Sequence, residues 1–237
     1  MRAVVLAGGL GTRLRPYTTV IPKPLVPVGD RPILEHILRQ LSDAGITHTD
    51  LCVSHLGELI QVYFSQDHAV PDGMHLDFHW EDEPLGTAGA LRVVPQLDST
   101  FIAMNGDVLT TLDYAALIEH HKREGALLTI ATHPKQVQID LGVIDSEGGR
   151  VTGYREKPRL DYRVSMGIYV YEPAALEHLP ESGPCQFPDL VLRLLDADEP
   201  VAVFENDADW YDIGTVSEYE RAINDLEKDP HAFGMGR

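Results

Sequence analysis

The chain has 237 residues, of which 43% are hydrophobic and 24% charged, and its 37 acidic residues against 19 basic ones give a formal charge of −18. This composition excludes a disordered chain and fits one globular domain with a substantial core. The acidity argues against binding to nucleic acid or to anionic membranes, and no apolar run approaches the roughly 18 residues of a membrane helix, so we expect a cytoplasmic protein.

Short apolar runs alternate with helical patterns over the first 135 residues. They predict strands at 3–7, 51–54, 76–80, 101–104 and 126–132, and helices at 33–41, 56–64, 87–94 and 114–124. This alternation predicts an α/β fold with a Rossmann-like, mostly parallel sheet sandwiched by helices. From about Gly142, short strands at 143–144, 151–154 and 167–171 predict a small antiparallel insertion, and residues 217–227 predict a closing helix. Because no linker or repeat divides the chain, we expect a single domain.

The strongest local signal is the run LAGGLGTRL at residues 6–14, where a buried strand leads into three glycines within four positions. Glycine lets the backbone turn sharply and brings N–H groups close to an anion. Because open α/β sheets bind ligands at the carboxyl ends of their strands, we expect this loop to line a binding site. Arg13 favours a phosphate ligand. The run matches neither the dinucleotide-binding pattern, which needs a glycine at Leu14, nor a P-loop.

The few cations are concentrated in two segments. Six lie within the first 39 residues, and five more lie between positions 150 and 163. Two such clusters in an acidic chain predict a local anion site. In the first cluster, Lys23 stands between two prolines, which hold the backbone extended and suit a charge delivered to a phosphate. In the second, Glu156 and Lys157 precede a proline and suit the hydroxyls and the phosphate of a ligand, with exposed ion pairing as the alternative.

Two carboxylates are candidates for a metal site. Asp107 follows the predicted strand 101–104 and is expected to point into the cleft, and Asp212 lies in an aromatic, glycine-rich turn. Beside phosphates the expected ion is Mg²⁺, a hard cation that takes carboxylate oxygens. The alternative for each aspartate is a capping role, although Thr215 and Ser217 suit the N-cap of the last helix better than Asp212 does.

Other sequence features argue against zinc catalysis and against a serine nucleophile. The histidines lack H-E-x-x-H spacing, no G-x-S-x-G motif is present, and Cys52 and Cys185 are expected to be free thiols. Residues 83–89, EPLGTAG, form a second glycine loop before a helix, and their small side chains would let a flat base approach the backbone.

Together these motifs resemble the sugar-1-phosphate nucleotidylyltransferases, or nucleotide-sugar pyrophosphorylases, and most closely their short mannose-1-phosphate guanylyltransferase-like members. The resemblance rests on residues 7–14, 22–24, 83–89 and 156–158 and extends from Leu6 to about Tyr219. It implies a nucleotide-binding part at about 1–135, a sugar-binding part at about 136–205 and a closing segment at 206–230. Since the chain ends soon after the last helix, we do not expect the C-terminal β-helix of larger members.

The resemblance also implies roles for single residues. Arg13, Lys23 and Asp107 would be catalytic, and Asp107 and Asp212 would hold Mg²⁺. The nucleotide would be contacted by Leu6, Gly8, Gly9, Gly11, Thr12, Gly86, Thr87 and Asn105. The sugar phosphate would be held by Gly142, Glu156, Lys157 and Ser165, where Ser165 stands in place of an asparagine that is frequent in the family.

The implied reaction is in-line attack by a sugar 1-phosphate oxygen on the α-phosphorus of a nucleoside triphosphate, which expels pyrophosphate. The attacking oxygen is already anionic near pH 7, so the task is to position two polyanions and offset their repulsion. The resemblance favours GTP and a mannose- or heptose-like sugar. Uridylyl, thymidylyl or cytidylyl transfer to another sugar 1-phosphate, transfer to an acceptor such as phosphocholine, and a non-catalytic nucleotide-sensing subunit are the alternatives. Similar enzymes are commonly dimers, so a homodimer is compatible with the resemblance.

Overall fold

The computed structural model describes residues 1–66 and 68–228. Residues 229 and 230, the last two of the predicted closing segment, lie outside the described residues. Within the described part of the chain, no helix combines the length and the apolar character needed to cross a membrane. Both cysteines are buried and free, as predicted.

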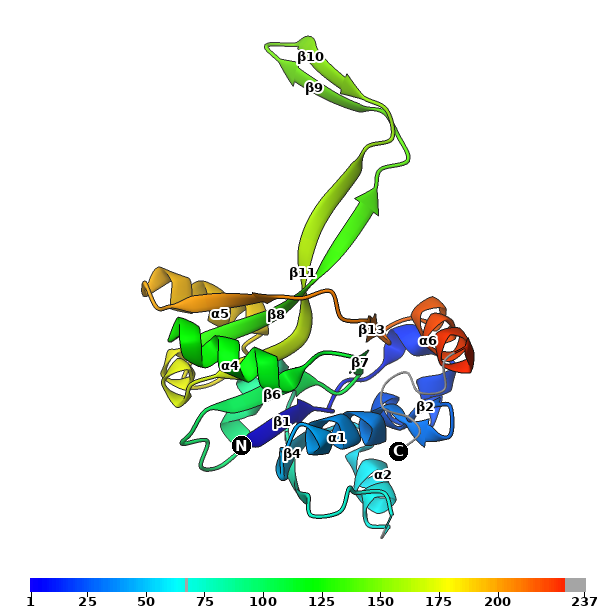
Figure 1. Ribbon diagram of the computed structural model, residues 1–237, viewed down its shortest axis with the longest axis vertical. Helices are drawn as coiled ribbons and strands as arrows, with labels where there is room; N and C mark the ends of the chain where they lie inside the picture. Colours follow the sequence, from blue (N-terminus) through cyan, green and yellow to red (C-terminus); the bar gives the residue numbers. More distant parts are fainter. Residues whose placement is uncertain (67, 229–237) are drawn as a thin grey trace.

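A seven-stranded sheet forms the centre of the molecule, in the order β12-β8-β11-β6-β1-β4-β5 (Figure 1). Its parallel part consists of β6 (Phe101–Asn105), β1 (Arg2–Leu6), β4 (His48–Val53) and β5 (His75–Trp80). The other strands are β11 (Arg159–Tyr171), antiparallel to both β6 and β8 (Leu128–Gln138), and β12 (Val201–Glu205), parallel to β8. The predicted Rossmann-like, mostly parallel sheet is therefore confirmed.

Helices cover both faces of this sheet. One core contains Ala3 and Val5 of β1 and is covered by α1 (Ile33–Asp43), α2 (Gly57–Phe64), α4 (Tyr114–Glu124) and α6 (Val216–Lys228). The opposite core contains Val4 and is covered by α3 (Gly86–Gly89), the 3-10 segment η4 (Ala90–Val93) and α5 (Phe187–Asp196). Successive side chains of a strand point to opposite faces, so the continuous apolar run of β1 serves both cores.

An antiparallel arm projects from the sheet. β8 and β11 remain paired from Thr132 opposite Ser165 to Gln138 opposite Arg159, and beyond them lies a hairpin of β9 (Val143–Glu147) and β10 (Arg150–Arg155). Figure 1 shows this hairpin at the far end of the arm, away from the helices. The predicted antiparallel insertion is present, but the strand predicted at 126–132 continues to Gln138 and forms one side of the arm.

Short elements surround the carboxyl ends of the parallel strands. The 3-10 segments are η1 (Thr12–Leu14), η2 (Tyr17–Thr19), η3 (Lys23–Leu25) and, elsewhere, η5 (Pro173–His178). Two small ladders join β2 (Pro27–Val28) to β3 (Arg31–Pro32), and β7 (Val108–Thr110) to β13 (Trp210–Asp212). The helix predicted at 87–94 is divided between α3 and η4.

Candidate active site

A cavity of about 290 Å³ lies at the carboxyl ends of β1, β4, β5 and β6. Parallel strands end on one edge of a sheet, so the loops that follow them converge there. Eight of the residues predicted from sequence line this cavity: Leu6, Gly8, Gly9, Lys23, Gly86, Thr87, Asn105 and Asp107. The glycine loop, the proline-flanked lysine and the strand-end aspartate, which are far apart in the chain, thus face one space.

The cavity depends on the missing side chain of Gly8. A Cβ at this position would lie 3.0 Å from Oε1 of Glu81 and 3.1 Å from Cβ of Ser54. Ser54 and Glu81 also line the cavity and were not among the predicted residues. Both immediately follow parallel strands, so the rule that ligands bind at strand ends was the signal that could have found them. Burial raises the pKa of Glu81, and the N–H of Leu85, 3.0 Å from Oε2, opposes this shift.

Gln186 is a third lining residue that sequence reasoning missed. Its Oε1 lies 3.4 Å from both the backbone nitrogen and Oγ1 of Thr87, a residue 99 positions away. The Thr87 hydroxyl in turn accepts a hydrogen bond of 2.8 Å from the N–H of Phe187. No local motif marks Gln186, because only the packing of α5 against α3 brings it to the cavity.

A buried ion pair joins Lys23 to Asp107. Lys23 begins η3 directly after Pro22, and only 7% of its surface is exposed. Its Nζ donates to Oδ2 of Asp107, which follows β6 and is itself partly exposed to the cavity. A lysine removed from water requires such a partner, because an uncompensated buried charge is strongly unfavourable. The pair therefore fixes both groups in the cavity wall, with their ends beside the space that a ligand can occupy.

Asp107 and Asp212, the two carboxylates predicted to hold a metal ion, are neighbours, although only Asp107 lines the cavity. β13 places Asp212 opposite Val108 of β7, and the N–H of Ile213 donates to the carbonyl oxygen of Asp107 at 3.1 Å. Oδ1 of Asp107 is buried and has no hydrogen-bond partner among the described residues. Burial, and then the charge of Asp107, raise the pKa of Asp212. A divalent cation would bind the buried Asp107 oxygen that lacks a donor, and its positive charge would stabilise the ionised form of Asp212. These residues therefore fit Mg²⁺.

Asp212→Asn is expected to stabilise the metal-free protein at neutral pH. Because the pKa of Asp212 is raised in the folded protein, ionising this group lowers the free energy of unfolding. This loss of stability is absent below the unfolded pKa of 3.8 and is complete once the pH has risen above the folded pKa. In EDTA the variant should therefore unfold at higher urea concentration than the wild type at pH 7, and the two should converge near pH 3.5. A variant less stable than the wild type at pH 7 would contradict the claim that ionised Asp212 destabilises the metal-free protein.

The remaining residues of the first glycine loop lie beside the cavity and outside its lining. Gly11 precedes η1, and its carbonyl oxygen accepts a hydrogen bond of 2.7 Å from the Thr18 hydroxyl. Thr12 and Arg13 are exposed. The Arg13 guanidinium lies against Gly214, where a Cβ would be 3.2 Å from Nη2, and its charge opposes the rise in the pKa of Asp212. Arg13 is thus a cation next to the carboxylate pair.

Ser165 lies at the base of the arm, close to one wall of the cavity. Its Oγ is 3.2 Å from the hydroxyl of Tyr169 and accepts a hydrogen bond of 3.2 Å from the N–H of Gly167. Gly167 is adjacent to Asn105, whose Nδ2 would be 2.6 Å from a Cβ at that position. Ser165 is therefore two residues before Gly167, which contacts the cavity-lining residue Asn105.

The other predicted sugar-phosphate residues lie on the arm. Gly142, Glu156 and Lys157 belong to the segments that flank the β9–β10 hairpin, and none of them lines the cavity. Gly142 is next to Tyr154, whose hydroxyl donates to Oε2 of Glu156 at 2.8 Å. The structure therefore groups Gly142 with Glu156 but does not bring them to the cavity. The five cations between positions 150 and 163 are likewise exposed on the arm, so the two cation clusters do not form one site.

Known proteins resemble this chain over almost its whole length. A family model described as "Nucleotidyl transferase" matches residues 2–229. The chain is 32% identical over 244 residues to a UTP–glucose-1-phosphate uridylyltransferase of Synechocystis, covering 94% of this chain and 62% of that protein. It is 30% identical over 227 residues to mannose-1-phosphate guanyltransferase beta-B of Xenopus laevis, covering 92% and 62%. The chain thus spans less than two thirds of the length of these curated relatives.

Solved structures share the fold. The crystal structure of HddC from Yersinia pseudotuberculosis has a TM-score of 0.75 and 29% identity, and the alignment covers 95% of this chain and 99% of that one. A structure of the same protein complexed with GMP-PN has a TM-score of 0.72 and 28% identity, with the same coverage. UDP-glucose pyrophosphorylase from Acinetobacter baumanii has a TM-score of 0.77 at 21% identity over 99% of this chain and 95% of that one, a likeness of fold.

Proposed function

This chain belongs to the nucleotidyl transferase family, and we propose that it transfers a nucleoside monophosphate from a nucleoside triphosphate to a sugar 1-phosphate and releases pyrophosphate. The observation that carries the proposal is the carboxylate pair beside a buried lysine, at a glycine-rich cavity on the carboxyl edge of the sheet. Such a site combines space for a nucleotide with charges suited to a phosphate chain.

The proposed chemistry is a single displacement. An oxygen of the sugar 1-phosphate forms a bond to the α-phosphorus while the bond from that phosphorus to the pyrophosphate oxygen breaks. Lys23 offsets negative charge on the phosphates, and Arg13 adds a second positive charge at the edge of the site. Asp107 and Asp212 would hold Mg²⁺, which supplies charge neutralisation between the two polyanions. No residue has to remove a proton, because the attacking oxygen is anionic near pH 7.

We propose GTP and a mannose- or heptose-like sugar 1-phosphate as the substrates. A relative named mannose-1-phosphate guanyltransferase and a neighbour complexed with GMP-PN support the guanine base. The second candidate is uridylyl transfer to glucose 1-phosphate, which the name of the Synechocystis relative supports. Gly86 and Thr87 line the cavity near Gln186 and are the proposed surface for the base.

A pyrophosphate-release assay tests the proposal. Purified protein with Mg²⁺ would be combined with GTP, UTP, dTTP or CTP and with a panel of sugar 1-phosphates and phosphocholine, and the product identified by mass spectrometry. Release from GTP with mannose or heptose 1-phosphate is expected. Release only from another pair would replace the proposed substrates. Nucleotide binding without release from any pair would overturn the proposed activity in favour of a nucleotide-sensing subunit.

Lys157 is proposed to contact the phosphate of the sugar substrate. Because Lys157 is exposed on the arm and lies outside the cavity lining, this contact requires the arm to approach the cavity when the substrate binds. Its backbone φ of 44° lies in the left-handed region that few non-glycine residues adopt. Lys157→Ala is expected to raise the KM for the sugar phosphate about tenfold to a hundredfold, the size of one charge-assisted hydrogen bond, with the KM for the nucleotide unchanged. Steady-state kinetics would measure both constants.

Lys135→Ala is the matched control, because Lys135 is an exposed cation on the other long strand of the arm. It should leave both constants near their wild-type values. Equal effects of the two substitutions would mean that the arm acts only through its general charge. No effect of Lys157→Ala would remove this residue from the site.

A further inference from the structure

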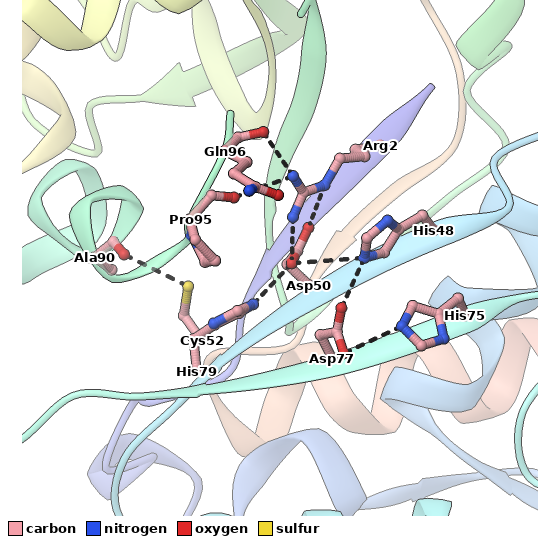
Figure 2. A network of polar contacts seen from close by, with 10 residues as sticks. All are labelled: Arg2, His48, Asp50, Cys52, His75, Asp77, His79, Ala90, Pro95 and Gln96. Atoms are coloured by element: carbon pink, nitrogen blue, oxygen red, sulfur yellow. Dashed lines mark hydrogen bonds and ion pairs between the residues drawn. The ribbon is translucent and has the colours of Figure 1, made fainter. Parts of the chain in front are cut away.

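A cluster of histidines and carboxylates lies near the amino ends of β4 and β5, whereas the cavity lies at the carboxyl ends of these strands. β4 and β5 pair in parallel, with His48 opposite His75 and Asp50 opposite Asp77. Because alternate residues share a face, each strand presents a His-x-Asp pair to the same side of the sheet, and Figure 2 shows the side chains converging there.

Three of these side chains surround a common point. Nε2 of His48 lies 2.9 Å from Oδ2 of Asp77, and Nε2 of His75 lies 3.2 Å from Oδ1 of the same carboxylate. The two imidazole rings are edge-to-face neighbours, with centroids 5.0 Å apart and an interplanar angle of 68°. One ligand atom from each residue lies within 4.8 Å of the others. Figure 2 shows the Asp77 carboxylate between the two imidazole rings, with each ring nitrogen next to a different oxygen of that group.

We propose that His48, His75 and Asp77 bind a divalent transition-metal ion of the zinc class, with water completing the coordination. Two histidines and one carboxylate are a recurrent three-ligand set for Zn²⁺, and imidazole nitrogen favours zinc, cobalt and nickel over magnesium. A tetrahedral ion with bonds of about 2.0–2.2 Å requires ligand atoms about 3.4 Å apart. The side chain of His75 is 68% exposed, so solvent and a metal ion can reach its ring.

Asp50, which lies beneath the cluster, is held in place by hydrogen bonds to neighbouring side chains. Asp50 is fully buried, and both of its oxygens accept hydrogen bonds from Arg2, at 2.8 and 3.0 Å. His79 adds a contact of 2.7 Å to Oδ1 of Asp50. Asp50 is thus occupied by its own partners and lies 3.8 Å from Nε2 of His48, where its negative charge favours a cation. A metal ion here would fasten β5, the last strand of the sheet, to β4.

The test is a titration of the chelator-treated protein with Zn²⁺ or Co²⁺ in excess Mg²⁺, which is added to fill the metal site proposed at Asp107 and Asp212. Calorimetry should give one binding equivalent, and Co²⁺ should develop visible absorption typical of nitrogen and oxygen ligands. At a free metal concentration of 100 times Kd, the Tm should rise by about 5–10 °C. His75→Gln should abolish binding of this metal ion and the Tm shift while leaving nucleotidyl transfer with Mg²⁺ unchanged.

His178→Gln is the matched control, because His178 is also paired with a carboxylate, Glu199, at 3.7 Å. It should retain the metal equivalent and the Tm shift. A second variant, His48→Gln, should reproduce the loss seen with His75→Gln, and the Tm of each variant in EDTA reports whether it is folded. An equivalent that survives both cluster substitutions, or a wild-type protein that binds no ion, would overturn the proposal.

Discussion

Asp107→Asn is expected to lower kcat by about a thousandfold while nucleotide binding without metal changes little. The substitution keeps the shape of the side chain but removes the negative charge that faces Lys23 and Asp212. A preorganised charge at a reacting phosphate contributes about 10²–10³ in rate, and Asp107 serves both the proposed metal and the lysine. Single-turnover kinetics and nucleotide titration in EDTA would separate the chemical step from binding.

Asp98→Asn supplies the control for this experiment, since Asp98 is an exposed aspartate near the start of β6 and far along the strand from the cavity. It should keep wild-type kcat. The ion pair also gives Asp107→Asn an expected effect on stability. Loss of Asp107 leaves Lys23 buried without its partner, so we expect a cost of about 1–3 kcal/mol in unfolding free energy. Asp107→Asn with more than a tenth of wild-type kcat would exclude the proposed role.

Gly86→Ala is expected to cost about 2–4 kcal/mol of unfolding free energy, the largest stability effect predicted for the site. Gly86 has φ = 77°, and a Cβ there would lie 2.6 Å from the carbonyl oxygen of Cys185. This carbonyl cannot move freely, because it accepts hydrogen bonds from the N–H groups of Ala88 and Gly89 at 3.0 and 2.9 Å. The backbone itself must shift, and urea unfolding would measure the loss.

Gly148→Ala separates the two causes of this effect. Gly148 also has a positive φ, 56°, but a Cβ there would meet no atom within 4 Å. It should therefore show only the conformational cost of about 1 kcal/mol. Gly86→Ala should also weaken nucleotide binding, because Gly86, Thr87 and Gln186 line the cavity together. Equal stability of the two variants would show that the contact with Cys185 is unimportant.

Local patterns in the chain predicted much of the fold. The apolar run that became β1 and the run at 101–104 that became most of β6 are continuous because both faces of each strand are buried. Gly125 ends α4 in the left-handed conformation, directly after the predicted helix 114–124. The arm was underestimated in length. The outer part of β8 is mostly exposed and has no apolar alternation, whereas the alternation of Leu160, Tyr162 and Val164 in β11 was a strand signal that the prediction missed.

Some residues of the site were identifiable from sequence for the same local reason. A glycine-rich turn or an aspartate directly after a buried strand must emerge at the edge of a parallel sheet, so the loop at 8–11 and Asp107 could be placed before their neighbours were known. Lys23 was predicted from its two flanking prolines, and it lines the cavity. Its partner could not be predicted, since the pair joins residues 84 positions apart.

The amino-acid sequence by itself determined the alternating strands and helices, the glycine turns and the chemical types of the groups that we propose to bind phosphate. These features depend on the period of apolar residues and on backbone conformation within a few positions. Only the tertiary structure decided that Gln186 joins the cavity, that Gly142, Glu156 and Lys157 lie out on an arm, and that His48 meets His75 near the amino ends of β4 and β5. Those arrangements follow from strand order, register and arm direction, which are set by contacts between segments distant in the chain.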